Sequence, residues 1–202
     1  MMTLHEHGTT AAGRHVRIWL WAGITGSVAG VVIAWLLAYS LYSTNYVYGR
    51  PLVFPVLLVL AGVISWTRGV GRFYRAVRVL GWLTAVGLAL ISVGLIGDYW
   101  IGQRNNVTLW RLGFLFDSMG SQLALFSSTA LGVVLLRAPS ESRLAAAALI
   151  SVIPLMVGLA FVMEGYIPSF PVAALCIVWG LRFTIHLRHH PLATSSAPHV
   201  AG

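Results

Sequence analysis

The chain has 202 residues, of which 58% are hydrophobic and 9% are charged, and its mean hydropathy is +0.83. This composition excludes an ordinary soluble domain and indicates an integral membrane protein. The formal net charge is +8, and every basic residue is an arginine. Because most of these arginines lie in short segments between apolar runs, we expect them to orient the protein in a membrane and not to bind nucleic acid.

The apolar runs predict an all-α, polytopic transmembrane bundle. About 20 residues cross the hydrocarbon layer as a helix, and no run shows the alternation typical of a membrane barrel strand. The six predicted spans form one domain over 18–185, with a cytoplasmic N-terminal segment at 1–17 and a disordered cytoplasmic tail at 186–202. In chain order the predicted spans are 18–41, 52–66, 79–97, 112–136, 144–163 and 168–185.

The first predicted span contains Gly26 and Gly30 in a G-x-x-x-G pattern. Glycines at this spacing leave a groove that lets another helix approach closely. The pattern predicts helix packing, either inside the bundle or between two copies of the chain.

The segment between the second and third predicted spans carries arginines near helical spacing, namely Arg68, Arg72, Arg75 and Arg78. We favour a role in setting membrane orientation. The alternatives are contact with anionic lipid headgroups, worth ~1 kcal/mol per arginine, and binding of a phosphate-bearing substrate.

The arginines predict the orientation of the whole bundle. Ten lie on the side of the two termini, and only Arg50, Arg104 and Arg111 lie on the opposite side. Because arginine is enriched in short cytoplasmic loops, both termini are expected in the cytoplasm of what is, from its arginine usage, a bacterial cell. The ten are Arg14, Arg17, Arg68, Arg72, Arg75, Arg78, Arg137, Arg143, Arg182 and Arg188.

The fourth predicted span carries an acid, Asp117. Counted from Trp110 as an interface anchor, it lies ~10 Å inside the outer boundary. An ionised carboxylate there costs ~2.5–3.5 kcal/mol, so Asp117 is expected to be protonated or paired. The same helical face holds small and weakly polar residues, which predicts that it turns toward other helices. These residues are Gly113, Gly120, Ser121 and Ser128.

Two further acids, Asp98 and Glu164, end the third and fifth predicted spans on the outer side. With Asp117 and Ser121 they would form a polar site that faces outward. The alternative, which we favour at this point, is that they are separate interfacial residues that pair with arginines or water.

The remaining chemistry-bearing residues predict neither a metal site nor a cofactor. All seven histidines lie outside the predicted spans, and Cys176 is the single cysteine. Haem ligation inside the bundle, a disulfide and a thiolate cluster are therefore excluded.

Three functions remain open. The first is an accessory or structural helix bundle, which would contact lipid and other membrane subunits or a second copy of the chain. The second is a small proton-coupled transporter that uses Asp117. The third is an enzyme that acts on lipid at the outer leaflet through Asp117, Asp98 and Glu164, provided that one substrate reaches all three. In the absence of a catalytic motif, we favour the first.

Overall fold

The computed structural model describes residues 4–40, 50–70, 75–102, 107–137, 143–163 and 169–189. Every regular element within these ranges is a helix, as the composition predicts. The elements are α1 (Leu4–Ser40), α2 (Val53–Gly69), α3 (Arg75–Leu95), the π-helix η3 (Ile96–Gly102), α5 (Val107–Leu136), α6 (Arg143–Ile150), α7 (Val152–Met163) and α8 (Ser169–His189).

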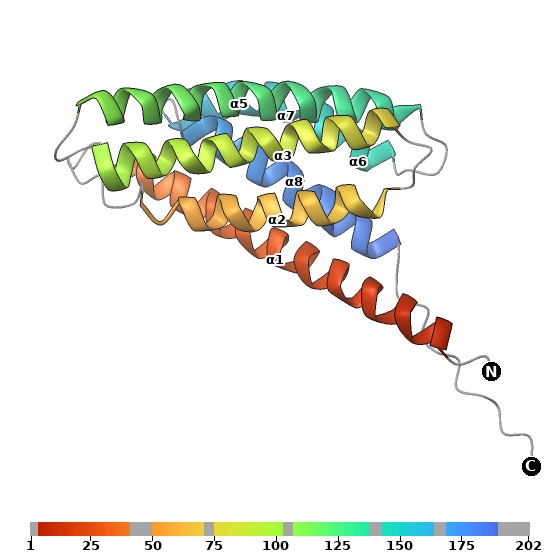
Figure 1. The fold of residues 1–202 in the computed structure, drawn as a ribbon. Helices are drawn as coiled ribbons and strands as arrows, with labels where there is room; N and C mark the ends of the chain where they lie inside the picture. The colour runs from red at the N-terminus through yellow and green to blue at the C-terminus, as the bar shows by residue number, and fades with distance from the viewer. Residues whose placement is uncertain are drawn as a thin grey trace, which may run out of the picture.

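The helices form a bundle in which α3 and α5 lie side by side along most of their length (Figure 1). Helix α2 packs between α1 and α3, and α8 crosses behind α2 and α3. Helix α1 begins and α8 ends at the same end of the bundle, where α2 also ends and α6 begins.

Each predicted span coincides with a helix or a pair of helices. Four helices are long and apolar enough to cross a membrane, and the bent pair α6 and α7 would make a fifth. Helix α2, with 17 residues, is shorter. Helices α1 and α8 extend beyond the predicted spans, to Leu4 and His189. The count of six and the orientation of the termini stay predictions.

The fifth predicted span is not one continuous helix, because α6 and α7 meet at an angle of 50° at Ser151. We attribute the break to Pro154. Its ring carries no N–H, so the carbonyl of Ile150 loses its helical donor, and proline also clashes with the preceding turn.

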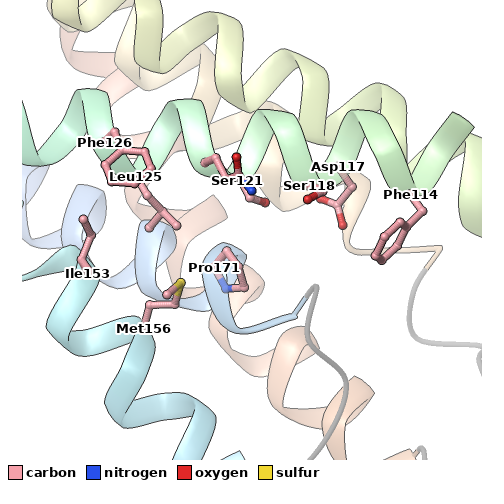
Figure 2. A pocket seen from close by; sticks show the side chains of 10 residues that line it. Phe114, Asp117, Ser118, Ser121, Leu125, Phe126, Ile153, Met156 and Pro171 are labelled. Carbon is pink, nitrogen blue, oxygen red and sulfur yellow. The ribbon is translucent and has the colours of Figure 1, made fainter.

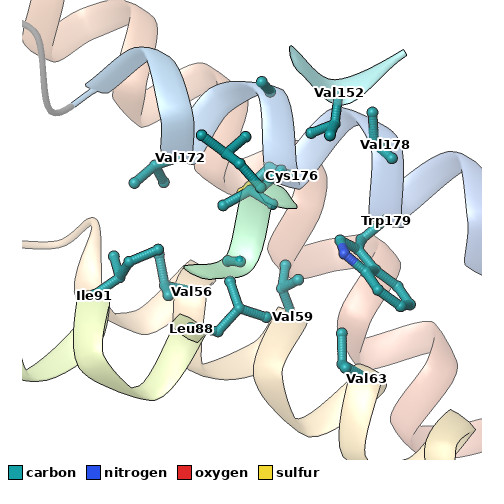
Figure 3. Close-up of a cluster of buried hydrophobic side chains, with 14 of the residues drawn as sticks. Val56, Val59, Val63, Leu88, Ile91, Val152, Val172, Cys176, Val178 and Trp179 are labelled. Atoms are coloured by element: carbon teal, nitrogen blue, oxygen red, sulfur yellow. The ribbon is translucent and has the colours of Figure 1, made fainter. Parts of the chain in front are cut away.

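The bundle interior mixes apolar side chains with small polar ones, while its exterior is apolar. Valines of α2, Leu88 and Ile91 of α3, and Trp179 of α8 meet in the centre (Figure 3). Large apolar side chains such as Trp35 and Phe161 are exposed. This distribution fits a protein whose outer face contacts lipid.

Glycines set the distance between the paired helices. A Cβ added to Gly120 of α5 would lie 2.6 Å from the carbonyl oxygen of Gly87 in α3. On α1, a Cβ added to Gly26 would lie 2.5 Å from the Cβ of Leu58, and one added to Gly30 would lie 2.5 Å from Sγ of Cys176. These glycines therefore lie against α2 and α8 within one chain.

Candidate functional site

One face of α5 carries small and weakly polar residues around Asp117, and this polar stripe packs into the bundle. Asp117 exposes only 4% of its surface, although ionisable groups are costly inside an apolar bundle. Its neighbours on the stripe are small, so the backbones of adjacent helices approach it closely. The buried residues of the stripe are Gly113, Asp117, Gly120, Ser121 and Ser128.

Backbone contact between the two helices brings Asp98 and Asp117 together. A Cβ added to Gly113, one turn before Asp117, would lie 2.6 Å from the backbone nitrogen of Asp98. A Cβ added to Gly94, one turn before Asp98, would collide with the backbone nitrogen of Asp117. The two acids thus belong to one helix–helix contact.

Asp98 lies on the π-helix η3, which continues α3. Short π-helical segments are rare and occur frequently at functional sites. The Arg50 side chain donates Nε–H to the carbonyl of Tyr99 at 3.0 Å, and the Trp100 indole donates to the carbonyl of Arg50 at 3.2 Å. These bonds hold η3 against the residues that precede α2, with Asp98 2% exposed.

The two carboxyl groups interact with each other. Asp117 accepts a hydrogen bond from the hydroxyl of Ser121, and it lies within electrostatic range of Asp98. The Oδ1 atom of Asp117 has no hydrogen-bond partner among the described residues. Because burial disfavours a charged carboxylate and Asp98 lies within electrostatic range, Asp117 can lower its energy by holding a proton or a cation.

Asp117 also lines a cavity of about 290 Å³ between α5, α7 and the start of α8 (Figure 2). The carboxyl group points from α5 toward this space, and Met156 and Pro171 lie opposite it. Polar groups therefore occupy one wall, while the remaining lining is apolar. The lining residues are Phe114, Asp117, Ser118, Ser121, Gln122, Leu125, Phe126, Ile153, Met156 and Pro171.

Further along α5, buried hydroxyl groups link it to two neighbouring helices. Thr84 of α3 and Ser127 share a hydrogen bond of 2.8 Å, and the Trp179 indole of α8 donates to Ser128 at 3.1 Å. Such bonds between membrane helices contribute ~0.6 kcal/mol on average. They fix how α3 and α8 lie against the helix that carries Asp117.

Arg182, counted among the predicted cytoplasmic arginines, lies inside the bundle and not in a segment beyond it; its cytoplasmic position stays a prediction. Helix α8 continues past it to His189, and Arg182 is 1% exposed. Its guanidinium carbon lies 4.8 Å from the centre of the Trp66 ring, a cation–π contact. The signal for burial was available, because Arg182 falls within the predicted span 168–185.

The other predicted site residues fall in different places. Glu164 and Arg72 lie outside the described residues. Arg68 and Arg75 are exposed at one end of the bundle, and Arg78 is half-buried. Within the described ranges, no three His, Cys, Asp or Glu side chains gather as metal ligands would.

Comparison of the chain with models of protein families, with curated proteins and with solved structures finds no match.

Proposed function

We propose that the protein is a small proton-coupled carrier of the cytoplasmic membrane, with six spans and both termini in the cytoplasm. The observation that carries this proposal is a buried acid, paired with a second acid, at the wall of a cavity. Helix ends that carry arginines lie where α1 begins and α8 ends (Figure 1), which supports the proposed orientation.

The proposed step is exchange at one carboxyl group. When Asp117 loses its proton, its charge repels that of Asp98 and is largely buried from solvent. Binding of a proton or of a substrate with positive charge or N–H groups relieves both costs. The proton and the substrate therefore compete for the same carboxyl group. This competition couples the movement of one to the movement of the other.

The carrier hypothesis is tested by proton movement into proteoliposomes that contain the dye pyranine. An imposed pH difference is applied, with and without alanine, glucose, succinate, tetraethylammonium or the primary amine decylamine. We expect wild-type protein to move protons faster than empty vesicles do, and Asp117→Asn to fall to the rate of empty vesicles.

Thr184→Val is the control variant. Its hydroxyl donates to the carbonyl of Gly180 in its own helix, α8, at 2.8 Å, and Thr184 does not line the cavity. This variant should keep the wild-type rate. Wild-type proton movement in Asp117→Asn would contradict the carrier hypothesis.

An accessory or structural bundle is the second candidate. The observation in its favour is the backbone contact between α3 and α5, in which a neutral Asp117 would only support packing. If wild-type protein moves no protons under any of the conditions above, this second function replaces the first.

A further inference from the structure

We propose that the ligand of the Asp117 cavity is an amphipathic amine, which enters from the bilayer with its ammonium group toward Asp117 and its chain along the apolar wall. This inference rests on the proposed carrier function and adds the chemical class of the substrate.

The polar end of the ligand follows from the buried acid. Asp117 is 4% exposed, lines the cavity, and its Oδ1 atom lacks a hydrogen-bond partner among the described residues. A buried carboxylate needs a positive charge or hydrogen-bond donors, and an ammonium group supplies both. Within the part of the chain that the structure describes, the lining holds no arginine or histidine, which favours a cationic ligand over an anion.

The apolar end follows from the opposite wall. Met156 and Ile153 of α7 line the cavity across from α5, which contributes Phe114 near one end and Phe126 near the other (Figure 2). Phe114 is 46% exposed and Phe126 is 66% exposed, so the cavity borders the lipid-facing surface. A ligand can thus leave part of its chain in the bilayer, and aromatic rings also favour a nearby ammonium group.

A bare metal cation fits this lining less well. Calcium takes six to eight oxygen ligands and magnesium an octahedral set. Among the described residues, the side-chain oxygens of the lining come from Asp117, Ser118, Ser121 and Gln122. Gln122 is exposed, which leaves too few converging oxygens for either ion.

The exchange is balanced as follows. A protonated Asp117 binds an alkylammonium ion, the O–H bond of the carboxyl group breaks, and the proton leaves to water. The product is an ion pair between carboxylate and ammonium, which carries no net charge. One proton is released for each amine that is bound.

The test compares three ligands with the same chain length: decylamine, decanol and decanoate. Purified protein in lipid nanodiscs is heated with each ligand, and proton release is followed in weakly buffered medium. For the wild type we expect decylamine to raise the unfolding midpoint more than decanol or decanoate does, with about one proton released per amine.

Variants of Asp117 and Met156 test separately whether binding needs the carboxyl charge and whether it needs the cavity volume. Asp117→Asn should respond equally to decylamine and decanol and release no proton, whereas Asp117→Glu should keep the preference for the amine. Met156→Trp should fill the cavity and lose the response although Asp117 is intact. Phe161→Ala, which alters an exposed side chain of α7 outside the lining, should behave like the wild type.

Equal responses of the wild type to decylamine and decanol would overturn the inference, as would an amine preference that survives in Asp117→Asn. If proton movement in proteoliposomes still depends on Asp117 under either result, only the substrate class is wrong. If that dependence is also lost, the proposed function is wrong as well.

Discussion

At the residue scale, Gly120 lets α3 and α5 lie in backbone contact, because it has no Cβ. In Gly120→Ala the new Cβ would lie 2.6 Å from the Gly87 carbonyl and 2.7 Å from the Ile91 nitrogen, both backbone atoms. Overpacking of this kind costs ~1–3 kcal/mol, which outweighs the ~1 kcal/mol gain in helix propensity. We expect a lower midpoint of thermal unfolding in detergent.

Gly158→Ala provides the matched control, since no atom lies within 4 Å of its added Cβ. This variant should unfold at the wild-type temperature or above it. Equal midpoints for the two alanine variants would mean that α3 and α5 separate at little cost.

The sequence predicts which way a side chain faces when the residues on its own helix decide the matter. The inward turn of Asp117 follows from the small residues on its own stripe. Its proximity to Asp98 does not, because that depends on which helices are neighbours and on the π-helical turn at η3. Separate interfacial acids that pair with arginines or water stay a prediction; the structure adds that the backbones of Asp98 and Asp117 lie at one helix–helix contact.

At the scale of elements, the bend between α6 and α7 is attributed to Pro154. In Pro154→Ala the restored N–H can bond the Ile150 carbonyl, and α7 should align with α6. Over 12 residues at ~1.5 Å each, straightening a 50° bend would move the end of α7 by about 15 Å.

Pulsed electron paramagnetic resonance between spin labels at V107C and F161C measures this movement. Both positions are exposed, while Cys176 is buried and should not react. Pro171→Ala is the control, because Pro171 occupies the first turn of α8, where no donor is missed. An unchanged distance in Pro154→Ala would assign the bend to the packing of α7 on α8.

Helix positions were largely predictable from apolar runs, because length and hydropathy are local properties. The break in the fifth span was missed although Pro154 lies ten residues after the predicted start at 144. The extensions of α1 and α8 were missed because polar residues can continue a helix beyond the hydrocarbon layer.

At the scale of the whole molecule, the arginine distribution predicts which end faces the cytoplasm. Helices α5 and α6 begin at opposite ends of the bundle (Figure 1). In intact cells, a membrane-impermeant maleimide should therefore label V107C at the start of α5 and leave L144C at the start of α6 unlabelled. Both positions are exposed, and L144C should react after the cells are permeabilised.

The labelling pattern also tests the span count. Three predicted spans precede V107C and four precede L144C, so the loss of one span before V107C would exchange the sides of the two positions. Labelling of L144C alone in intact cells would reverse the proposed orientation. The positive-inside bias could be read from the sequence because it depends on charge counts and not on helix order.

We expect the contact between α3 and α5 to make these two helices more rigid than α7. Where two backbones touch through glycine, neither helix can tilt without a collision, so α5 forms a fixed wall of the cavity. Helix α7, the opposite wall, is joined to α6 through a broken helical ladder and exposes Val157, Phe161 and Val162. Changes in cavity width should therefore come from rotation of α7 about Ser151, at a cost set by contacts with lipid and α8.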